Sequence, residues 1–260
     1  MSSEESGGKQ LPRKGIQSIE TGARLLDVMI DVRQPIRLRE LSKHSGLSPS
    51  KARMYLVSFI RTGLVTQDEV SGLYAPGPKA IRLGLVALGQ NRLVSTAREF
   101  VHSFGKEEGF PVLLTTWDSL SPVIIESSES RDVLPIAFRI GTPTPLWTTA
   151  TGAVFLAYLP EKTAERAIAE ECPETLRAEV RETAKTARQQ GFAYTRSVRL
   201  TPTVTLNGYG ALAVPVLSPE EKLESVITVL VPADTLEAEA PDKLARRILD
   251  KVSHFSQNLG

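Results

Sequence analysis

The sequence predicts a two-domain α+β protein, with an N-terminal winged helix-turn-helix, a linking helix and a larger C-terminal domain around a mostly antiparallel sheet. Three observations predict this class. The chain has 260 residues, and 41% of them are hydrophobic, which is enough for two cores. Three helix patterns and then a hairpin pattern fill residues 16–77. Strand and helix patterns mix throughout residues 92–260. We place a disordered tail at 1–15 and the linking helix at 78–91.

Composition excludes several classes of protein. The net charge of +1 argues against a uniformly basic nucleic-acid binder. A single cysteine excludes a disulfide framework within the chain, and three histidines far apart in sequence offer no local metal site, so we expect no metal and no cofactor. No apolar run approaches the ~18–20 residues of a membrane span, and the start of the chain is polar. We therefore expect a cytoplasmic protein.

The charge is unevenly distributed along the chain. Residues 1–89 contain 13 Lys/Arg and 8 Asp/Glu, a net charge of +5, whereas residues 90–260 carry −4. Within residues 33–62, seven basic residues accompany one acid, Glu40. This split indicates a polyanion-binding module joined to a different domain, although a solvated helical face explains the charges about equally well.

The first two helices are predicted at residues 19–32 and 38–45. The first ends before Pro35, and the second ends at Gly46, a typical C-terminal break. The expected buried stripe of the first helix consists of apolar residues at helical spacing: Ile19, Ala23, Leu26, Met29 and Ile30.

The third helix begins at Ser48-Pro49, because serine is a good N-cap and proline is favoured at the first helical position. It runs to about Thr62, with an expected buried stripe of Ala52, Tyr55, Leu56, Phe59 and Ile60. Strand-like pieces at Leu64–Gln67 and Leu73–Ala75 then flank a turn-rich segment, which predicts a hairpin. This order is the winged helix-turn-helix, whose third helix enters the major groove of DNA.

The outward face of the third helix carries the candidate DNA contacts. Arg and Lys bind guanine edges or phosphates, serine hydroxyls donate to phosphate, and the helix N-terminus attracts anions. The candidates on this helix and its cap are Ser48, Ser50, Lys51, Arg53, Met54 and Arg61, with Val57 beside them. Arg37 and Arg39 are expected at backbone phosphates, although plain surface charge explains them nearly as well.

The helix predicted at 79–89 is apolar on nearly every face, because only Lys79 and Arg82 are charged. Such a helix must be buried. We expect it to pack against its own symmetry mate, which makes the protein at least a homodimer.

The second domain is predicted to open with a helix at 92–108. The expected strands are Val112–Trp117, Val123–Ser127, Leu134–Ile140, Phe192–Val198, Tyr209–Leu217 and Glu224–Val231. The further expected helices are 149–159, 161–171, 174–190 and 240–258.

Short sequence segments distributed over nearly the whole chain after residue 15 match the motifs of one known protein family. The N-terminal runs are Leu41-Ser42-Lys43-His44-Ser45-Gly46-Leu47-Ser48-Pro49-Ser50-Lys51, Leu56, Gly63-Leu64-Val65, Gly72-Leu73-Tyr74, Gly77 and Leu83-Gly84. The C-terminal runs are Gly141-Thr142-Pro143-Thr144-Pro145-Leu146, Thr149-Ala150-Thr151-Gly152-Ala153, Leu156-Ala157, Gln190-Gly191-Phe192-Ala193 and Leu212-Ala213-Val214-Pro215-Val216. In this order, the runs resemble the IclR family of bacterial transcriptional regulators.

The resemblance implies a winged helix that binds a double-stranded DNA operator, a dimerising linker helix, and a GAF-like domain at 92–260 that binds a small effector. Family members act as homodimers or dimers of dimers, and many are repressors. The residues implied at the effector pocket are Leu134, Ala150, Thr151, Gly152, Tyr209, Ala211, Thr228 and Leu230. Their mixture suits a small organic acid or aromatic metabolite, while plain core packing explains each single residue about as well.

Two positions depart from the family pattern. Many members carry an arginine near the middle of the recognition helix, where this chain has Met54, and Arg53 lies about 100° away on the helix. The loop before Tyr209 lacks the acid that the family usually has there, so a ligand group that would meet that acid needs another partner.

Two other classes of function stay open at this point. A small-molecule enzyme fused to a helical module has little support, because the sequence has no Walker loop, GxSxG, HExxH or paired-carboxylate spacing. The Gly208–Ala213 run matches GxGxxA but precedes a strand, so we reject a dinucleotide site, and Cys172, between Glu171 and Pro173, is expected to be inert. A protein-interaction scaffold without DNA binding has no need of the +6 charge over 33–62. We predict a regulator and not an enzyme.

Overall fold

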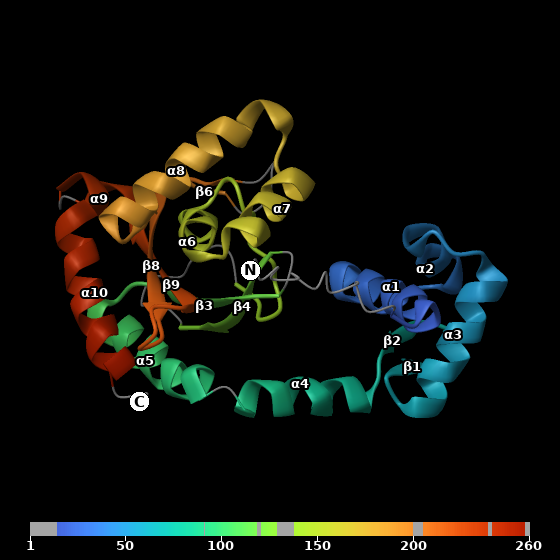
Figure 1. Ribbon diagram of the computed structural model, residues 1–260. Helices are drawn as coiled ribbons and strands as arrows, with labels where there is room; N and C mark the ends of the chain where they lie inside the picture. Colours follow the sequence, from blue (N-terminus) through green and yellow to red (C-terminus); the bar gives the residue numbers. More distant parts are fainter. Residues whose placement is uncertain are drawn as a thin grey trace, which may run out of the picture. The chain divides into compact units, whose positions relative to one another are not determined.

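The computed structural model describes residues 15–90, 92–118, 121–128, 138–199, 205–238 and 241–257. The chain divides into two compact units, residues 1–90 (unit 1) and residues 91–260 (unit 2) (Figure 1). Most of the predicted tail and most of the predicted strand at Leu134–Ile140 lie outside the described residues. The described end of that strand, residues 138–140, is not in a strand.

Unit 1 contains the predicted three helices and hairpin, followed by one more helix. Its elements are α1 (Gln17–Val32), α2 (Leu38–Ser45), α3 (Pro49–Thr62), β1 (Val65–Gln67), β2 (Tyr74–Pro76) and α4 (Pro78–Gln90). Strands β1 and β2 pair in antiparallel register, with Thr66 opposite Ala75. Leu25, Leu41 and Leu56, one from each of the first three helices, are completely buried and form the centre of the core.

The buried stripe of α1 differs from the predicted one. Ile19 and Ile30 are 67% and 59% exposed, and the residues that face the core are Thr21, Gly22, Leu25, Val28 and Met29. Both sets have helical spacing, so periodicity alone could not choose between them. Close packing favours the second set, because a Cβ atom at Gly22 would lie only 3.0–3.1 Å from the rings of Phe59 and Tyr55, and only glycine fits there. The predicted stripe of α3 is also wrong at its end, where Ile60 is 36% exposed.

Helix α4 has no buried residue within the single chain. Its apolar side chains stand in solvent, with Ile81, Leu83 and Leu85 all more than 60% exposed. Within the described part of the single chain nothing buries this helix, so the expected burial against a symmetry mate stays a prediction.

Unit 2 is built around a five-stranded antiparallel sheet. Its strands in spatial order are β4 (Pro122–Ser127), β3 (Val112–Trp117), β9 (Leu223–Pro232), β8 (Tyr209–Leu217) and β5 (Ala193–Thr195). A separate two-stranded hairpin joins β6 (Val198–Arg199) to β7 (Thr205–Leu206). The predicted strand Phe192–Val198 is thus shorter than expected.

Helices cover both faces of this sheet (Figure 1). On one face lie α5 (Arg92–Glu108) and α10 (Pro241–Gln257), and on the other lies α6 (Ala150–Tyr158). Outside α6 are α7 (Glu161–Glu171), a 3-10 turn η1 (Glu174–Leu176) and α8 (Arg177–Gln190). The short α9 (Ala233–Ala238) was not predicted. No helix in the described part of the chain is long and apolar enough to cross a membrane.

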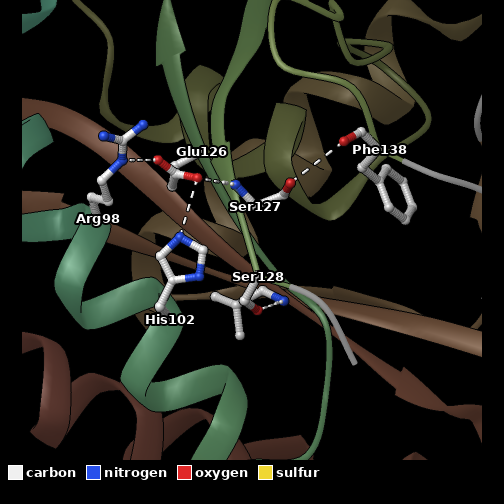
Figure 2. A network of polar contacts seen from close by, with 7 residues as sticks. Arg98, His102, Glu126, Ser127, Ser128 and Phe138 are labelled. Carbon is white, nitrogen blue, oxygen red and sulfur yellow. Dashed lines mark hydrogen bonds and ion pairs between the residues drawn. The ribbon is translucent and has the colours of Figure 1, made fainter. Parts of the chain in front are cut away.

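A buried carboxylate fixes α5 against the edge strand β4 (Figure 2). The register of β3 and β4 shifts between Leu114 and Thr115, so Glu126 pairs with Leu114 and shares the face that α5 covers. Two residues one helical turn apart on α5 contact its carboxylate: Arg98 through Nε, and His102 through Nε2 at 3.4 Å. A buried carboxylate needs such partners. The contacts therefore set the position of α5.

Candidate nucleic-acid interface and effector site

The outer face of α3 is fully available to a partner. Ser50, Lys51, Arg53, Val57 and Arg61 are all exposed. Met54 is 72% exposed in the middle of this face, so the position of the usual arginine is occupied by a bare apolar side chain. The structure therefore places the predicted candidates of this helix on one accessible surface.

The turn between α2 and α3 is held by hydrogen bonds that fix the angle of α3. The Leu47 N–H donates to the Ser42 carbonyl at 3.2 Å, and the Ser42 hydroxyl donates to the Leu47 carbonyl. Ser48 then caps α3, since its Oγ accepts from the Lys51 N–H at 3.4 Å. This cap uses a lone pair, so the Ser48 hydroxyl hydrogen stays available to an acceptor such as a phosphate.

Arg37, at the N-cap position before α2, and Arg39 within α2 are both exposed, and neither side chain accepts a capping hydrogen bond. The Arg37 N–H donates to the Glu40 carboxylate at 3.4 Å, so Glu40 closes this N-terminus. The guanidinium of Arg37 is then left to solvent or to an anion. In the hairpin turn, Asp68 accepts hydrogen bonds from the side chain and backbone of Ser71, which lowers its pKa. The segment Asp68–Gly72 has two acids and no base, so the cations of this region lie on α2 and α3.

The first turn of α6 is shaped by the loop before it. Thr149 caps the helix, accepting from the Gly152 N–H at 3.0 Å and donating to the Pro145 carbonyl at 2.7 Å. A side chain at Gly152 would overlap the carbonyl of Leu146. Gly152 is therefore required for close packing, and the loop carbonyl covers it.

The predicted effector residues of α6, β8 and β9 come together against the sheet. The Thr151 and Thr228 hydroxyl oxygens are 2.7 Å apart, and these residues are only 3% and 2% exposed. Ala150, Ala211 and Leu230 belong to the same buried cluster, and Ala211 is directly opposite Leu230 in the sheet. Tyr209 is half-buried at its border. Leu134 lies outside the described residues.

Sequence reasoning missed the neighbours of Thr228 in the sheet. Leu113 on β3 and Ala213 on β8 flank it in register and belong to this cluster. Only strand pairing could have identified them, because they are far from Thr228 in sequence.

Cys172 is buried, and burial raises the pKa of its thiol. The sequence suggested acidic neighbours alone, but Arg177 and Arg181 lie near enough to oppose this shift, and Arg177 donates to the Cys172 carbonyl at 3.2 Å. Desolvation is the larger effect, so the thiol stays protonated at neutral pH. Among the described residues, no group of three or more His, Cys, Asp or Glu could hold a metal ion.

Two family models match consecutive parts of the chain. The IclR helix-turn-helix domain matches residues 18–69, and the domain described as bacterial transcriptional regulator IclR C-terminal matches residues 86–257. The chain belongs to the IclR family. The IclR resemblance and the predicted fold class are confirmed, and the named IclR relatives are transcriptional regulators.

Curated relatives and solved structures agree with this assignment. The HTH-type transcriptional regulator XynR of Escherichia coli K12 is 27% identical over 146 residues, which cover 56% of this chain and 58% of XynR. The transcriptional repressor IclR of the same strain is 25% identical over 149 residues, covering 56% of this chain and 54% of the repressor. The chain thus matches little more than half the length of these relatives.

Two solved IclR structures share the fold over nearly the whole chain. An IclR transcriptional regulator from Alicyclobacillus acidocaldarius has a TM-score of 0.73 at 24% identity and covers 95% of this chain and 98% of its own. An IclR homolog from Microbacterium hydrocarbonoxydans, complexed with 4-hydroxybenzoate, has a TM-score of 0.73 at 14% identity, with 93% and 98% covered.

Proposed function

We propose that this IclR-family chain is a cytoplasmic repressor that binds a double-stranded DNA operator through α3, and that a small organic acid or aromatic metabolite in unit 2 modulates this binding. The observation that carries the proposal is the exposed face of α3, which presents Lys51, Arg53 and Arg61 from a rigidly capped helix. An enzyme or a scaffold has no need of such a face.

Each candidate contact has a role that follows from its chemistry. Arg53 and Lys51 suit guanine edges, because their donors match the O6 and N7 acceptors in the major groove. Met54 suits an apolar contact, such as a thymine methyl group, in place of the arginine–guanine contact. Ser48, Ser50 and Arg61, with Arg37 and Arg39 of α2, suit phosphates, which fix the position of α3 in the groove without reading sequence.

A homodimer follows from the bare surface of α4. Soluble monomers rarely leave contiguous apolar surface exposed, and α4 exposes five large apolar side chains: Ile81, Leu83, Leu85, Val86 and Leu88. The exposed Ile19 and Ile30 of α1 add to the apolar surface of unit 1. A two-fold dimer requires a pseudo-palindromic or repeated operator, and a dimer of dimers would bind two such sites.

The effector site is proposed at the Thr151–Thr228 pair. An anionic ligand that displaces their mutual hydrogen bond would accept from both hydroxyls, while Leu230 and Ala211 would contact its body. The 4-hydroxybenzoate held by the Microbacterium homolog is a ligand of this class.

Salt-dependent binding to DNA tests the function. Duplexes covering the regions on either side of the gene would be titrated in a shift assay at several salt concentrations. The affinity should fall linearly in a log–log plot, by about 0.9 of a log unit per phosphate contact for each tenfold rise in salt. Failure to shift any duplex at low salt would contradict the proposal and support a scaffold.

The ligand class is tested separately with 4-hydroxybenzoate in a thermal-shift assay. A ligand at 100 times its Kd adds about 2.7 kcal/mol of stability, which is a clear rise in melting temperature. If small carboxylates and phenols all leave the melting temperature unchanged, the proposed effector class is wrong, while the DNA assay still stands on its own.

A further inference from the structure

The outward face of α3 is apolar at its centre. Met54 lies two residues from Ala52 and two residues from Leu56, which are both completely buried. Because each residue turns the helix by about 100°, a residue two positions from both of them points directly away from the core. Met54 is 72% exposed there, and Val57, almost one turn further along the same face, is 47% exposed. Met54 and Val57 therefore form an apolar strip on the side of α3 that is opposite the core.

The apolar strip is not used by the core of unit 1. The larger side chains of α3 that pack against this core are Tyr55 and Phe59, on the other side of the helix. The polar neighbour Ser58 is already satisfied, because its hydroxyl donates to the Met54 carbonyl at 3.2 Å. Scattered exposed apolar side chains are common on protein surfaces, so the surroundings of the strip decide what it fits.

On α3, the charged side chains around the strip are all cations. The helix Pro49–Thr62 contains Lys51, Arg53 and Arg61 and no acid. At about 100° per residue, Lys51 and Arg53 lie on opposite sides of the line through Met54, and all three cations are exposed. This face complements a polyanion. The major groove of DNA is a polyanionic surface that also offers an apolar group, the 5-methyl group of thymine.

We propose that Met54 and Val57 contact the 5-methyl groups of two thymines at neighbouring base pairs in each operator half-site. The proposal rests on the proposed DNA binding and adds the bases that α3 selects. Three residues along a helix span about 4.5 Å, and stacked base pairs are about 3.4 Å apart, so the two side chains meet successive base pairs. Adenine, guanine and cytosine present polar groups there, which the strip would desolvate without pairing them. The strip thus favours thymine.

Deoxyuridine tests the contact, because it lacks only the 5-methyl group of thymidine and keeps the O4 acceptor and the base pair. The full chain would select a duplex from a random-sequence pool, and each thymine of that duplex would then be replaced singly by deoxyuridine. At two neighbouring base pairs, loss of the methyl group should weaken binding about fourfold, the expected effect of exposing one buried methyl group. The salt dependence should stay the same, because no charge is removed.

Two variants assign each methyl group to its side chain. Met54→Ala and Val57→Ala should each bind the unmodified duplex less tightly and should each lose the response to deoxyuridine at one of the two positions. Both changes remove exposed side chains and introduce a good helix former, so the melting temperature should not fall. Ile140→Ala, which removes an exposed apolar side chain from unit 2, is the matched control and should keep the wild-type affinity and response.

The failure of this proposal is distinguishable from the failure of the proposed function. If the full chain selects no duplex from the pool, the proposed DNA binding is wrong, and the thymine contacts are wrong with it. If the chain binds a selected duplex but deoxyuridine has no effect at any two neighbouring base pairs, only the thymine contacts are overturned. The same conclusion follows if Met54→Ala and Val57→Ala both keep the wild-type response to deoxyuridine.

Discussion

The hydroxyl oxygens of Thr151 and Thr228 lie 2.7 Å apart in the interior of unit 2, although the residues are 77 positions apart in the chain. One hydroxyl comes from the second residue of α6 and the other from the middle of β9. Each is the polar partner of the other in a cluster of apolar side chains. This pair joins the helix to the sheet at the proposed effector site, and it has consequences for stability as well as for ligand binding.

Replacing one member of the pair should cost more than replacing both. Thr151→Val leaves the buried Thr228 hydroxyl without its partner, which should lower the free energy of unfolding by about 1–3 kcal/mol. The double change with Thr228→Val removes both polar groups and should recover part of that loss. Urea unfolding followed by tryptophan fluorescence measures this in unit 2, because Trp117 and Trp147 are the only tryptophans. Strictly additive losses would contradict the pairing.

Substitutions on the outer face of α3 should weaken DNA binding without unfolding the protein. Arg53→Ala or Lys51→Ala should cost about 1–3 kcal/mol of operator affinity, since each removes a charged donor from an exposed position. Circular dichroism should be unchanged. Lys162→Ala in unit 2 serves as a matched control for the loss of one cation, and unaltered duplex binding by both α3 variants would refute the assignment of this helix.

A charge in the middle of α4 should dissociate the dimer. Leu85→Glu places a carboxylate on the apolar surface that we expect a second subunit to cover, and burying it unpaired would be costly. Sedimentation velocity should show a dimer or larger assembly for the wild type and a monomer for this variant. Arg82→Gln on the same helix controls for the same change of −1 in net charge, and a wild-type monomer at micromolar concentration would disprove the interface.

Gly152→Ala should destabilise unit 2 more than Gly141→Ala does. A side chain at Gly152 would overlap the backbone of Leu146, which cannot move without displacing the loop before α6. At Gly141 (φ +82°) nothing lies within 4 Å, so alanine there meets only the left-handed backbone penalty of about 1–2 kcal/mol. Urea unfolding followed by tryptophan fluorescence gives the free energy of unfolding of each variant. If both variants lose the same free energy of unfolding, the loop before α6 can move to accommodate a side chain at position 152.

The secondary structure of unit 1 could be predicted from the sequence because local chemistry defines each end. Ser48-Pro49 begins α3, and Gly46 and Gly63 (φ +69° and +77°) end α2 and α3 at positions where other residues are strained. The exposed face of α3 followed from the same pattern, because Ala52 and Leu56, with Tyr55 and Phe59 packed against them, face the core and leave the cations outside.

Packing decided what periodicity left open. Two sets of apolar residues on α1 had helical spacing, and the approach of the Phe59 and Tyr55 rings to Gly22 selected the one that contains Leu25. The face of Glu126 depended on a shift in strand register, and the neighbours of Thr228 depended on which strands pair.

The sequence by itself determined the fold class, the order of elements in unit 1 and the basic face of α3, because caps, breaks and charge act over a few neighbouring residues. Only the tertiary structure decided that Thr151 meets Thr228 and that Gly152 packs against the carbonyl of Leu146. These relationships join residues from different elements, and their distances follow from the packing of helices on a sheet, which no local pattern encodes.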